Sequence, residues 1–308
     1  MIDFRYHLIS IIAIFLALAA GVALGAGPLD EPFSEQLASE ADRDRQDKAD
    51  LRTELDDAEQ VRAFQDAFAK QVGTDLVSGA LQDRTVALFV LPDADEGAAD
   101  GVADEVEAAG GSVTTTVNLT EKMVDPSQQQ FAEGVARQSL DGQKNTPNTS
   151  GMSSYELLGT ALARAYLGDG SDTKFDSTSG TIASAYKEAG FVEAKGQPSA
   201  RASLAVFVVP PATSMEDNQD QVVATIAGAA DTQSAGAVVG GPPGSAADDG
   251  AVAYIRSNDV GDSVSTVDAV SVTAGQIVTV LALQREAGGK SGHYGTEDGA
   301  DQAMPDAG

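Results

Sequence analysis

Side chains that could catalyse a reaction or bind a soft metal are few in this chain of 308 residues. It contains no cysteine, two histidines and five methionines. Without cysteine it can form no disulfide, no thiolate metal site and no cysteine nucleophile. His7 lies in the N-terminal leader, so any imidazole chemistry in the rest of the chain would depend on His293.

His293 would have to act as the base of any Ser-His-Asp hydrolase. No G-x-S-x-G sequence, typical of the nucleophile turn in such enzymes, follows a predicted strand. The surrounding segment, Gly289–Gly295, is rich in glycine and gives the ring little support. We therefore expect His293 to be a surface or docking residue and the protein to have no enzymatic activity, with a catalytic base as the alternative.

Two glycine-rich segments share only part of the phosphate-loop pattern. Gly289-Lys290-Ser291 follows a predicted helix rather than a strand, and Gln284 stands where a phosphate loop needs its first glycine. Gly240–Gly244 does follow a predicted strand, but its two prolines remove amide donors that a phosphate would need. We predict a tight turn there, and we assign no cofactor-binding residue.

Acidic residues follow the first predicted strand, where Asp93, Asp95 and Glu96 could offer oxygen ligands to calcium or magnesium. The EF-hand pattern fails because Gly97 replaces its third oxygen ligand. Capping of the next helix, where a carboxylate interacts favourably with the helix dipole, is the other interpretation and explains the cluster more simply. We therefore assign no metal ligand here.

Copper requires a different set of ligands. Cu(I) prefers cysteine or methionine and Cu(II) prefers imidazole. The methionines stand singly and form no Met-x-Met or histidine-rich cluster, so the sequence shows no evident copper site; they are Met1, Met123, Met152, Met215 and Met304.

The charge excludes one class of partner. The formal net charge is −28, and a nucleic-acid binder needs a basic face that releases counterions from the phosphates. Anionic lipid headgroups would also repel such a chain. We interpret the acidity as a solvated surface, and a surface that attracts cations is the alternative.

An uncharged apolar run, Leu8–Gly27, dominates the N-terminal residues 1–27. Roughly 20 helical residues span roughly 30 Å, the thickness of a bilayer core, so we predict a single-pass membrane anchor. A cleaved signal peptide ending at Ala23-Leu24-Gly25 and a buried core helix are the alternatives. Arg5 before the run, although offset by Asp3, and the acids after it favour a cytoplasmic N-terminus and an extracytoplasmic main domain.

Residues 28–80 predict a helical stalk after the helix breakers Pro28 and Pro32. Apolar residues recur at spacings of three and four, except where Asp44 and Lys48 interrupt them. We predict a coiled-coil-like helix that pairs from Leu51 onward in a homo-oligomer; packing against its own domain is the alternative. The stripe consists of Leu37, Ala41, Leu51, Leu55, Ala58, Val61, Phe64, Phe68 and Val72.

Residues 81–289 predict an extracytoplasmic α/β domain built from two strand–helix–strand units. The apolar strands Thr85–Leu91 and Ala202–Pro210 contain the similar sequences VALFVLP and LAVFVVP, offset by 118 residues. Strands that are apolar throughout are typical of a sheet buried on both faces, so we expect a doubly wound, Rossmann-like, mostly parallel sheet. The remaining predicted elements are helices at 97–109, 218–230 and 274–287 and strands at 112–119, 235–239 and 263–272.

The connecting and terminal segments complete this prediction. An amphipathic helix is predicted at 153–167 and another helix at 181–189, with polar loops at 141–151 and 168–180. Residues 290–308 predict a flexible C-terminal tail, disordered beyond Gly295.

Two blocks of this sequence resemble the actinobacterial MctB-like family of copper transporters. The N-terminal block is Met1–Ser10 with Phe15–Leu18 and Gly21–Gly25. The C-terminal block consists of Ser265–Asp268, Ala274–Gln276, Val280–Leu283 and Gly289–Gly295. Because the blocks lie at opposite ends, the resemblance spans nearly the whole chain.

This resemblance implies a cell-envelope protein involved in copper homeostasis or efflux, described in the family as an efflux or outer-membrane channel component. One apolar helix cannot line a pore by itself, so we expect an indirect role or action as an oligomer. The alternative, also implied by the family, is a non-enzymatic scaffold that binds a membrane or cell-wall partner, as in septal cell-wall hydrolase control.

Overall fold

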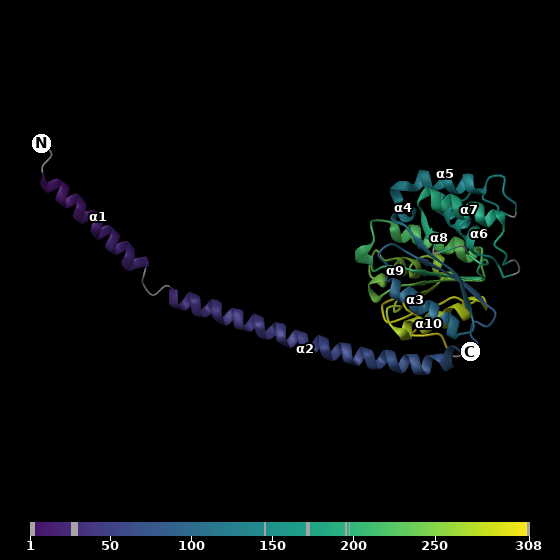
Figure 1. Cartoon of the computed structure of the whole chain (residues 1–308), viewed down its shortest axis with the longest axis horizontal. Coiled ribbons are helices and arrows are strands. Elements are labelled where there is room, and N and C mark those ends of the chain that lie inside the picture. The colour runs from purple at the N-terminus through teal and green to yellow at the C-terminus, as the bar shows by residue number, and fades with distance from the viewer. Residues whose placement is uncertain are drawn as a thin grey trace. The chain divides into compact units, whose positions relative to one another are not determined.

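The computed structural model describes residues 4–25, 30–144, 146–170, 173–194, 196 and 198–306 (Figure 1). The chain divides into two compact units, Met1–Gln65 and Asp66–Gly308. The first contains helix α1 (Phe4–Gly25) and most of helix α2 (Asp30–Val77). Pro32 falls in the first turn of α2, where the missing N–H of proline is tolerated. Met1, Asp3 and Pro28 lie outside the described residues.

Helix α1 is long and apolar enough over Tyr6–Ala23 to cross a membrane, and none of that stretch is buried against protein. By its length and composition this helix agrees with the predicted anchor.

The second unit is built on a seven-stranded sheet in the order β3-β2-β1-β4-β5-β6-β7. Neighbouring strands are parallel except for β3, which runs antiparallel to β2 at one edge. The strands are β1 (Thr85–Val90), β2 (Ser112–Leu119), β3 (Val192–Ala194), β4 (Leu204–Val208), β5 (Ala237–Gly240), β6 (Ser265–Val267) and β7 (His293–Tyr294).

The two similar strand sequences are direct neighbours at the centre of this sheet. Strands β1 and β4 pair with Val86 opposite Leu204 and Phe89 opposite Phe207. The two phenylalanine rings stack with their centroids 4.8 Å apart. Alternate residues of each strand enter different cores, so both faces of the sheet centre are apolar and buried.

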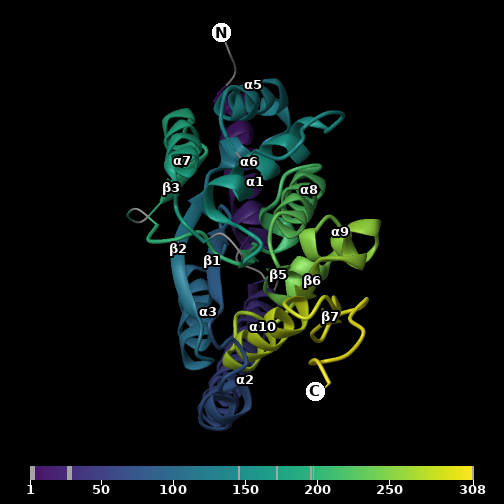
Figure 2. The ribbon, with the colours of Figure 1, turned by 90° about the vertical axis from the view of Figure 1, so that its right-hand side faces the viewer.

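Helices cover both faces of the sheet (Figure 2). One face carries α4 (Glu121–Val124), α5 (Gln129–Leu140), α6 (Ser154–Tyr166), α7 (Ser177–Ala189), α8 (Gln219–Thr232) and α9 (Ala251–Arg256); the other carries α3 (Glu96–Ala108) and α10 (Thr273–Glu286). The last turns of α2 pack on the same face as α3 and α10.

Helix α6 lies inside its layer rather than at its surface. Every residue from Leu157 to Tyr166 is buried, so the prediction of an amphipathic helix here was wrong about its environment. The buried Arg164 donates to Asp176 at 2.7 Å and to the Ser179 hydroxyl at 2.9 Å. A buried cation is tolerated because these partners replace water.

The C-terminal segment differs most from the sequence prediction. The strand predicted at 263–272 is limited to β6, and the segment predicted to be a flexible tail pairs with it as β7. The backbone N–H groups of Thr296 and Glu297 donate to the buried carboxylate of Asp268. This non-local anchor orders a segment whose local composition is typical of disorder.

The contact between α6 and α8 yields a stability prediction. A Cβ atom at Gly159 would lie 2.9 Å from Ile226 Cα and from Ala229 Cβ, so the two helix backbones would have to separate. We expect Gly159→Ala to lower the free energy of unfolding by about 1–3 kcal/mol, measured by urea denaturation of the full chain in detergent. Gly134→Ala on α5, where a Cβ meets nothing within 4 Å, is the matched control and should stabilise by about 0.5–1 kcal/mol. Equal effects at the two sites would contradict this packing.

Candidate functional site

The carboxyl ends of β1 and β4 flank the place where the chain reverses its direction of travel across the sheet. In open α/β sheets this is where ligands usually bind. A cavity of about 160 Å³ lies here, and its walls come from the segments that follow β1, β2 and β4. The lining residues are Leu91, Pro92, Asp93, Glu121, Val124, Asp125, Pro210, Ser214, Met215, Glu216, Gln219 and Val223.

The structure separates the acidic residues that the sequence grouped after the first strand. Asp93 lines the cavity and has a left-handed backbone, with φ of 57°. Asp95 instead accepts a hydrogen bond from the Gly97 N–H at 2.8 Å and caps α3, and Glu96 begins the first turn of that helix. The helix-capping interpretation is therefore confirmed for Asp95.

Three further carboxylates line the same cavity and were missed from sequence: Glu121, Asp125 and Glu216. Hydrogen bonds from the side chain and backbone N–H of Ser127, each 2.7 Å, lower the pKa of Asp125. The sequence does place all three after predicted strands. Because the carboxyl ends of parallel strands meet at one edge of the sheet, that position could have indicated that they lie together. Four carboxylates repel phosphate groups and attract cations.

The side chains that line this cavity differ from the ligands that copper prefers. Carboxylates suit hard cations, and Met215 is the soft donor among the lining residues. Within the described part of the chain, no group of three or more histidine, aspartate or glutamate side chains is placed to hold a metal ion. Of the other methionines, Met123 is buried in the core and Met304 is partly exposed, while Met1 lies outside the described residues.

The glycine-rich segment after β5 forms a turn. The Ser245 N–H donates to the Pro242 carbonyl at 2.8 Å, and Pro243–Ala246 form a short 3-10 helix. The predicted tight turn is confirmed, and its prolines leave no row of amide donors to receive a phosphate.

His293 lies in β7 and is half-buried. Its Nδ1 is 3.0 Å from the Thr266 hydroxyl on β6, and its backbone N–H donates to Asp301. Burial lowers the pKa of the imidazole. The ring thus holds an edge strand against its neighbour, and it is not among the residues that line the carboxyl-edge cavity.

A buried ion pair lies beside His293. Arg256 of α9 and Asp268 are 3.0 Å apart, and both side chains are almost fully buried. The same guanidinium donates to the Thr266 hydroxyl and to the Tyr294 carbonyl, each at 2.9 Å. Asp268 in turn receives the backbone N–H groups that hold the residues after β7. This network is structural, because every contact joins one part of the chain to another.

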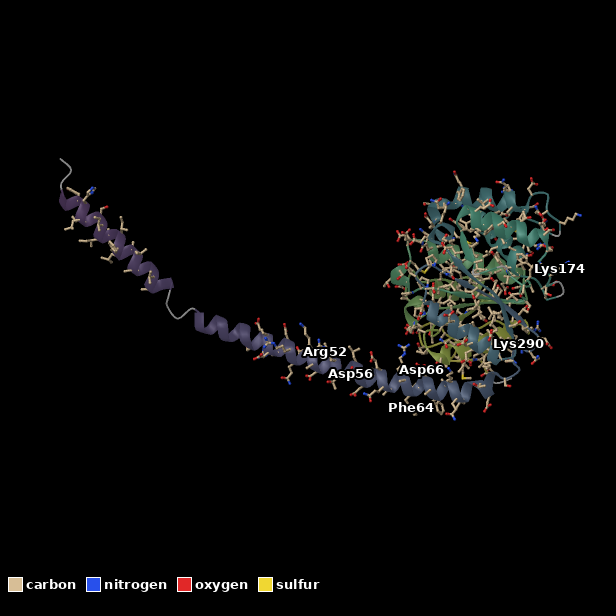
Figure 3. The ribbon with its side chains drawn as sticks, in the orientation of Figure 1. Arg52, Asp56, Phe64, Asp66, Lys174 and Lys290 are labelled. Atoms are coloured by element: carbon tan, nitrogen blue, oxygen red, sulfur yellow. The ribbon has the colours of Figure 1, made fainter. Side chains whose placement is uncertain are left out.

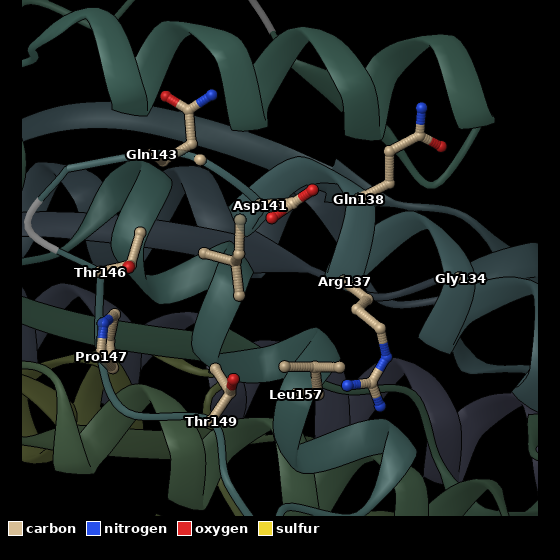
Figure 4. A pocket seen from close by; sticks show the side chains of 11 residues that line it. Gly134, Arg137, Gln138, Asp141, Gln143, Thr146, Pro147, Thr149 and Leu157 are labelled. Atoms are coloured by element: carbon tan, nitrogen blue, oxygen red, sulfur yellow. The ribbon is translucent and has the colours of Figure 1, made fainter.

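A second cavity, of about 680 Å³, lies between α5 and the 141–149 loop (Figure 4). Its lining combines glutamine and threonine side chains with one cation and one acid, Arg137 and Asp141, and Leu140 and Leu157 are apolar contacts. Arg137 at this cavity pairs with Glu133 at 2.7 Å. Such a surface suits a neutral polar ligand better than a metal ion.

A buried carboxyl group lies at the amino end of β6, on the side of the sheet away from the carboxyl-edge cavity. Glu286, at the end of α10, accepts hydrogen bonds from the backbone N–H and hydroxyl of Ser265. Burial raises the pKa of Glu286 to about 7, and the neighbouring Asp231 contributes to the shift. Burial also raises the pKa of Asp231.

The Glu286 shift predicts the sign of a pH dependence. Between pH 4.5, the ordinary pKa, and about 7, the unfolded chain releases a proton that the folded chain retains. Stability should therefore fall as pH rises through this window, by about 3 kcal/mol from this group. Urea denaturation at pH 4.5 and pH 8 measures the difference. Glu286→Gln should flatten it, leaving a smaller slope from Asp231, and the exposed control Glu107→Gln should not; an unchanged slope in Glu286→Gln would contradict the assignment.

The Arg256–Asp268 pair predicts what orders the C-terminal segment. Asp268→Asn leaves Arg256 buried without its counter-charge, so we expect a loss of about 3–5 kcal/mol in the free energy of unfolding. Limited proteolysis should also cut faster within residues 290–306. Asp301→Asn, which alters one exposed hydrogen bond to the His293 N–H, should change both measurements much less. Equal proteolysis of the two variants would show that Asp268 does not hold this segment.

Comparison with known proteins matches nearly the whole chain. The family described as "Copper transport outer membrane protein, MctB" matches residues 1–305. Proteins named copper transporter MctB from Mycobacterium bovis and Mycobacterium tuberculosis are each 34% identical over 310 residues, covering 97% of this chain and 98% of the relative. The protein of the same name from Mycobacterium leprae is 31% identical over 319 residues, with the same coverage. The chain therefore belongs to the MctB family.

Proposed function

We propose that this protein is a membrane-anchored cell-envelope component of copper homeostasis or efflux. The family match over residues 1–305, at both ends of the chain, is the observation that carries the proposal. The apolar helix α1 supports a single-pass anchor. Arg5 before the apolar run and the acids after it support a cytoplasmic N-terminus and an extracytoplasmic domain. The family description adds an outer-membrane location, which would require this domain to associate with that membrane.

A copper role for this chain is indirect or requires several copies. One helix cannot enclose a pore, and β1 and β4 are apolar and covered on both faces, so they line no channel. The parallel strand order with helices on both faces supports the doubly wound, Rossmann-like description of the domain. Self-association through the stalk, as a coiled coil or a shorter contact, would bring several anchors together.

The second candidate is a non-enzymatic scaffold that binds a cell-wall or membrane partner, including one that controls a septal cell-wall hydrolase. It is favoured by the small number of side chains that could bind copper, since the chain has no cysteine and two histidines. The cavity beside α5 offers such a partner a polar surface. Neither candidate requires a catalytic residue.

A deletion strain distinguishes the two candidates. For a copper role, we expect growth to be inhibited at lower copper concentration, with zinc tolerance unchanged as the control. The full chain should restore tolerance, whereas a secreted form starting at Asp30 should not, because it lacks the anchor. Normal copper tolerance, together with no copper binding by the purified full chain in a titration, would exclude the copper role and leave the scaffold.

A further inference from the structure

The last turns of α2, within the second unit, use one face to pack against their own domain. Asp66 accepts a hydrogen bond from the Thr273 N–H at 3.2 Å, and Val77 is completely buried. Gly73 lies so close to Ile277 that a Cβ atom there would overlap the Ile277 side chain. Because Asp66, Gly73 and Val77 share one helix face, the domain already occupies that face.

The other face carries apolar side chains that nothing in the described structure covers. Phe68, Val72 and Leu76 are 62, 47 and 46% exposed, and we call these three residues the α2 ridge. Phe64, one turn earlier, is 71% exposed and points to the opposite side of the helix from Asp66 (Figure 3). Covering such side chains gains roughly 25 cal/mol per Å² of apolar surface, so this face favours a partner.

The α2 ridge is nearly uncharged, although the chain is strongly acidic. By helical geometry its neighbours are Gln65, Gln71 and one acid, Asp75, whereas Asp66 and Lys70 point elsewhere. Two copies that each carry a formal charge of −28 repel one another over most of their surfaces. A face that carries few charges lets two copies approach with little repulsion between like charges.

We propose that a second copy of this chain covers the α2 ridge. This step rests on the membrane anchoring proposed above, because α1 would hold two copies in one bilayer and so raise the effective concentration at which their α2 helices meet. Each ridge then meets its own counterpart across a twofold axis, the commonest arrangement of homodimers.

The spacing of the ridge indicates how the two helices meet. A heptad seam through Phe64 and Phe68 would continue to Gln71 and Asp75, which are polar. The apolar line instead continues at intervals of four to Val72 and Leu76. Ridges of this spacing interdigitate when helices cross at about −50°. The copies therefore cross close to their domains rather than forming a coiled coil along this segment.

The ridge is too small to hold a dimer in dilute solution. A stable interface buries about 800 Å² on each partner, which three partly exposed side chains fall well short of. Anchoring in one membrane raises the effective concentration of the second copy and makes a weak contact sufficient. The association should therefore be tested in membranes.

The absence of cysteine from the sequence makes crosslinking specific. Gln71→Cys places a thiol beside the ridge, and Thr74→Cys places one on an exposed position away from it. Cell membranes containing each full-length variant are treated with a short bis-maleimide. We expect Gln71→Cys to form an adduct of twice the chain mass and Thr74→Cys to form little. Adding Phe68→Asp should reduce the Gln71→Cys adduct about tenfold, whereas Thr74→Asp, with the same charge away from the ridge, should leave it unchanged.

Three outcomes would overturn the proposal. Equal adducts from both cysteine positions would indicate random collision, an adduct of another mass would mean that a different protein covers the ridge, and no adduct at Gln71→Cys would mean that no copy is there. Equal thermal unfolding of the Phe68→Asp variant and the parent shows that the domain is intact. Copper tolerance is scored separately, so failure of the copper role would leave the crosslinking result standing.

Discussion

The pairing of β1 with β4 buries both faces of two apolar strands at the centre of the sheet. Such strands require a layer of helices on each side, because either face left in water would forfeit the hydrophobic free energy that holds the domain together. The rings of Phe89 and Phe207 stack within one core. Helices α3 and α10, with the end of α2, complete the other.

This central pairing also positions the carboxyl-edge cavity. The connections leave β1 and β4 towards opposite edges of the sheet, so a hollow remains between their ends. In nucleotide-binding proteins glycine-rich loops fill this place with amide donors. Here Pro92 and Pro210 follow the strands and carboxylates surround the hollow. The same architecture therefore presents an acidic edge that disfavours phosphate ligands.

Sequence was sufficient where structure depends on neighbouring residues and insufficient where it depends on distant ones. The apolar runs of β1 and β4, the turn after β5 and the Asp95 cap follow from local patterns. The burial of α6 depends on Asp176, which neutralises Arg164, and β7 depends on Asp268. The cavity was found only in part because Glu121 and Glu216 come from segments far apart in the chain.

The α2 ridge and the surface of the folded domain differ in charge. At physiological ionic strength the repulsion between surface charges decays over about 8 Å, so two acidic copies can approach within that distance only along a surface with few charges. The carboxyl edge of the sheet would repel a second acidic copy, because four carboxylates surround one hollow there. The α2 ridge is different, because Phe68, Val72 and Leu76 are exposed apolar side chains and Asp75 is the one acid beside them. Selection for a solvated domain alone would favour charge on this ridge. Its apolar character is instead expected of a surface that meets another protein.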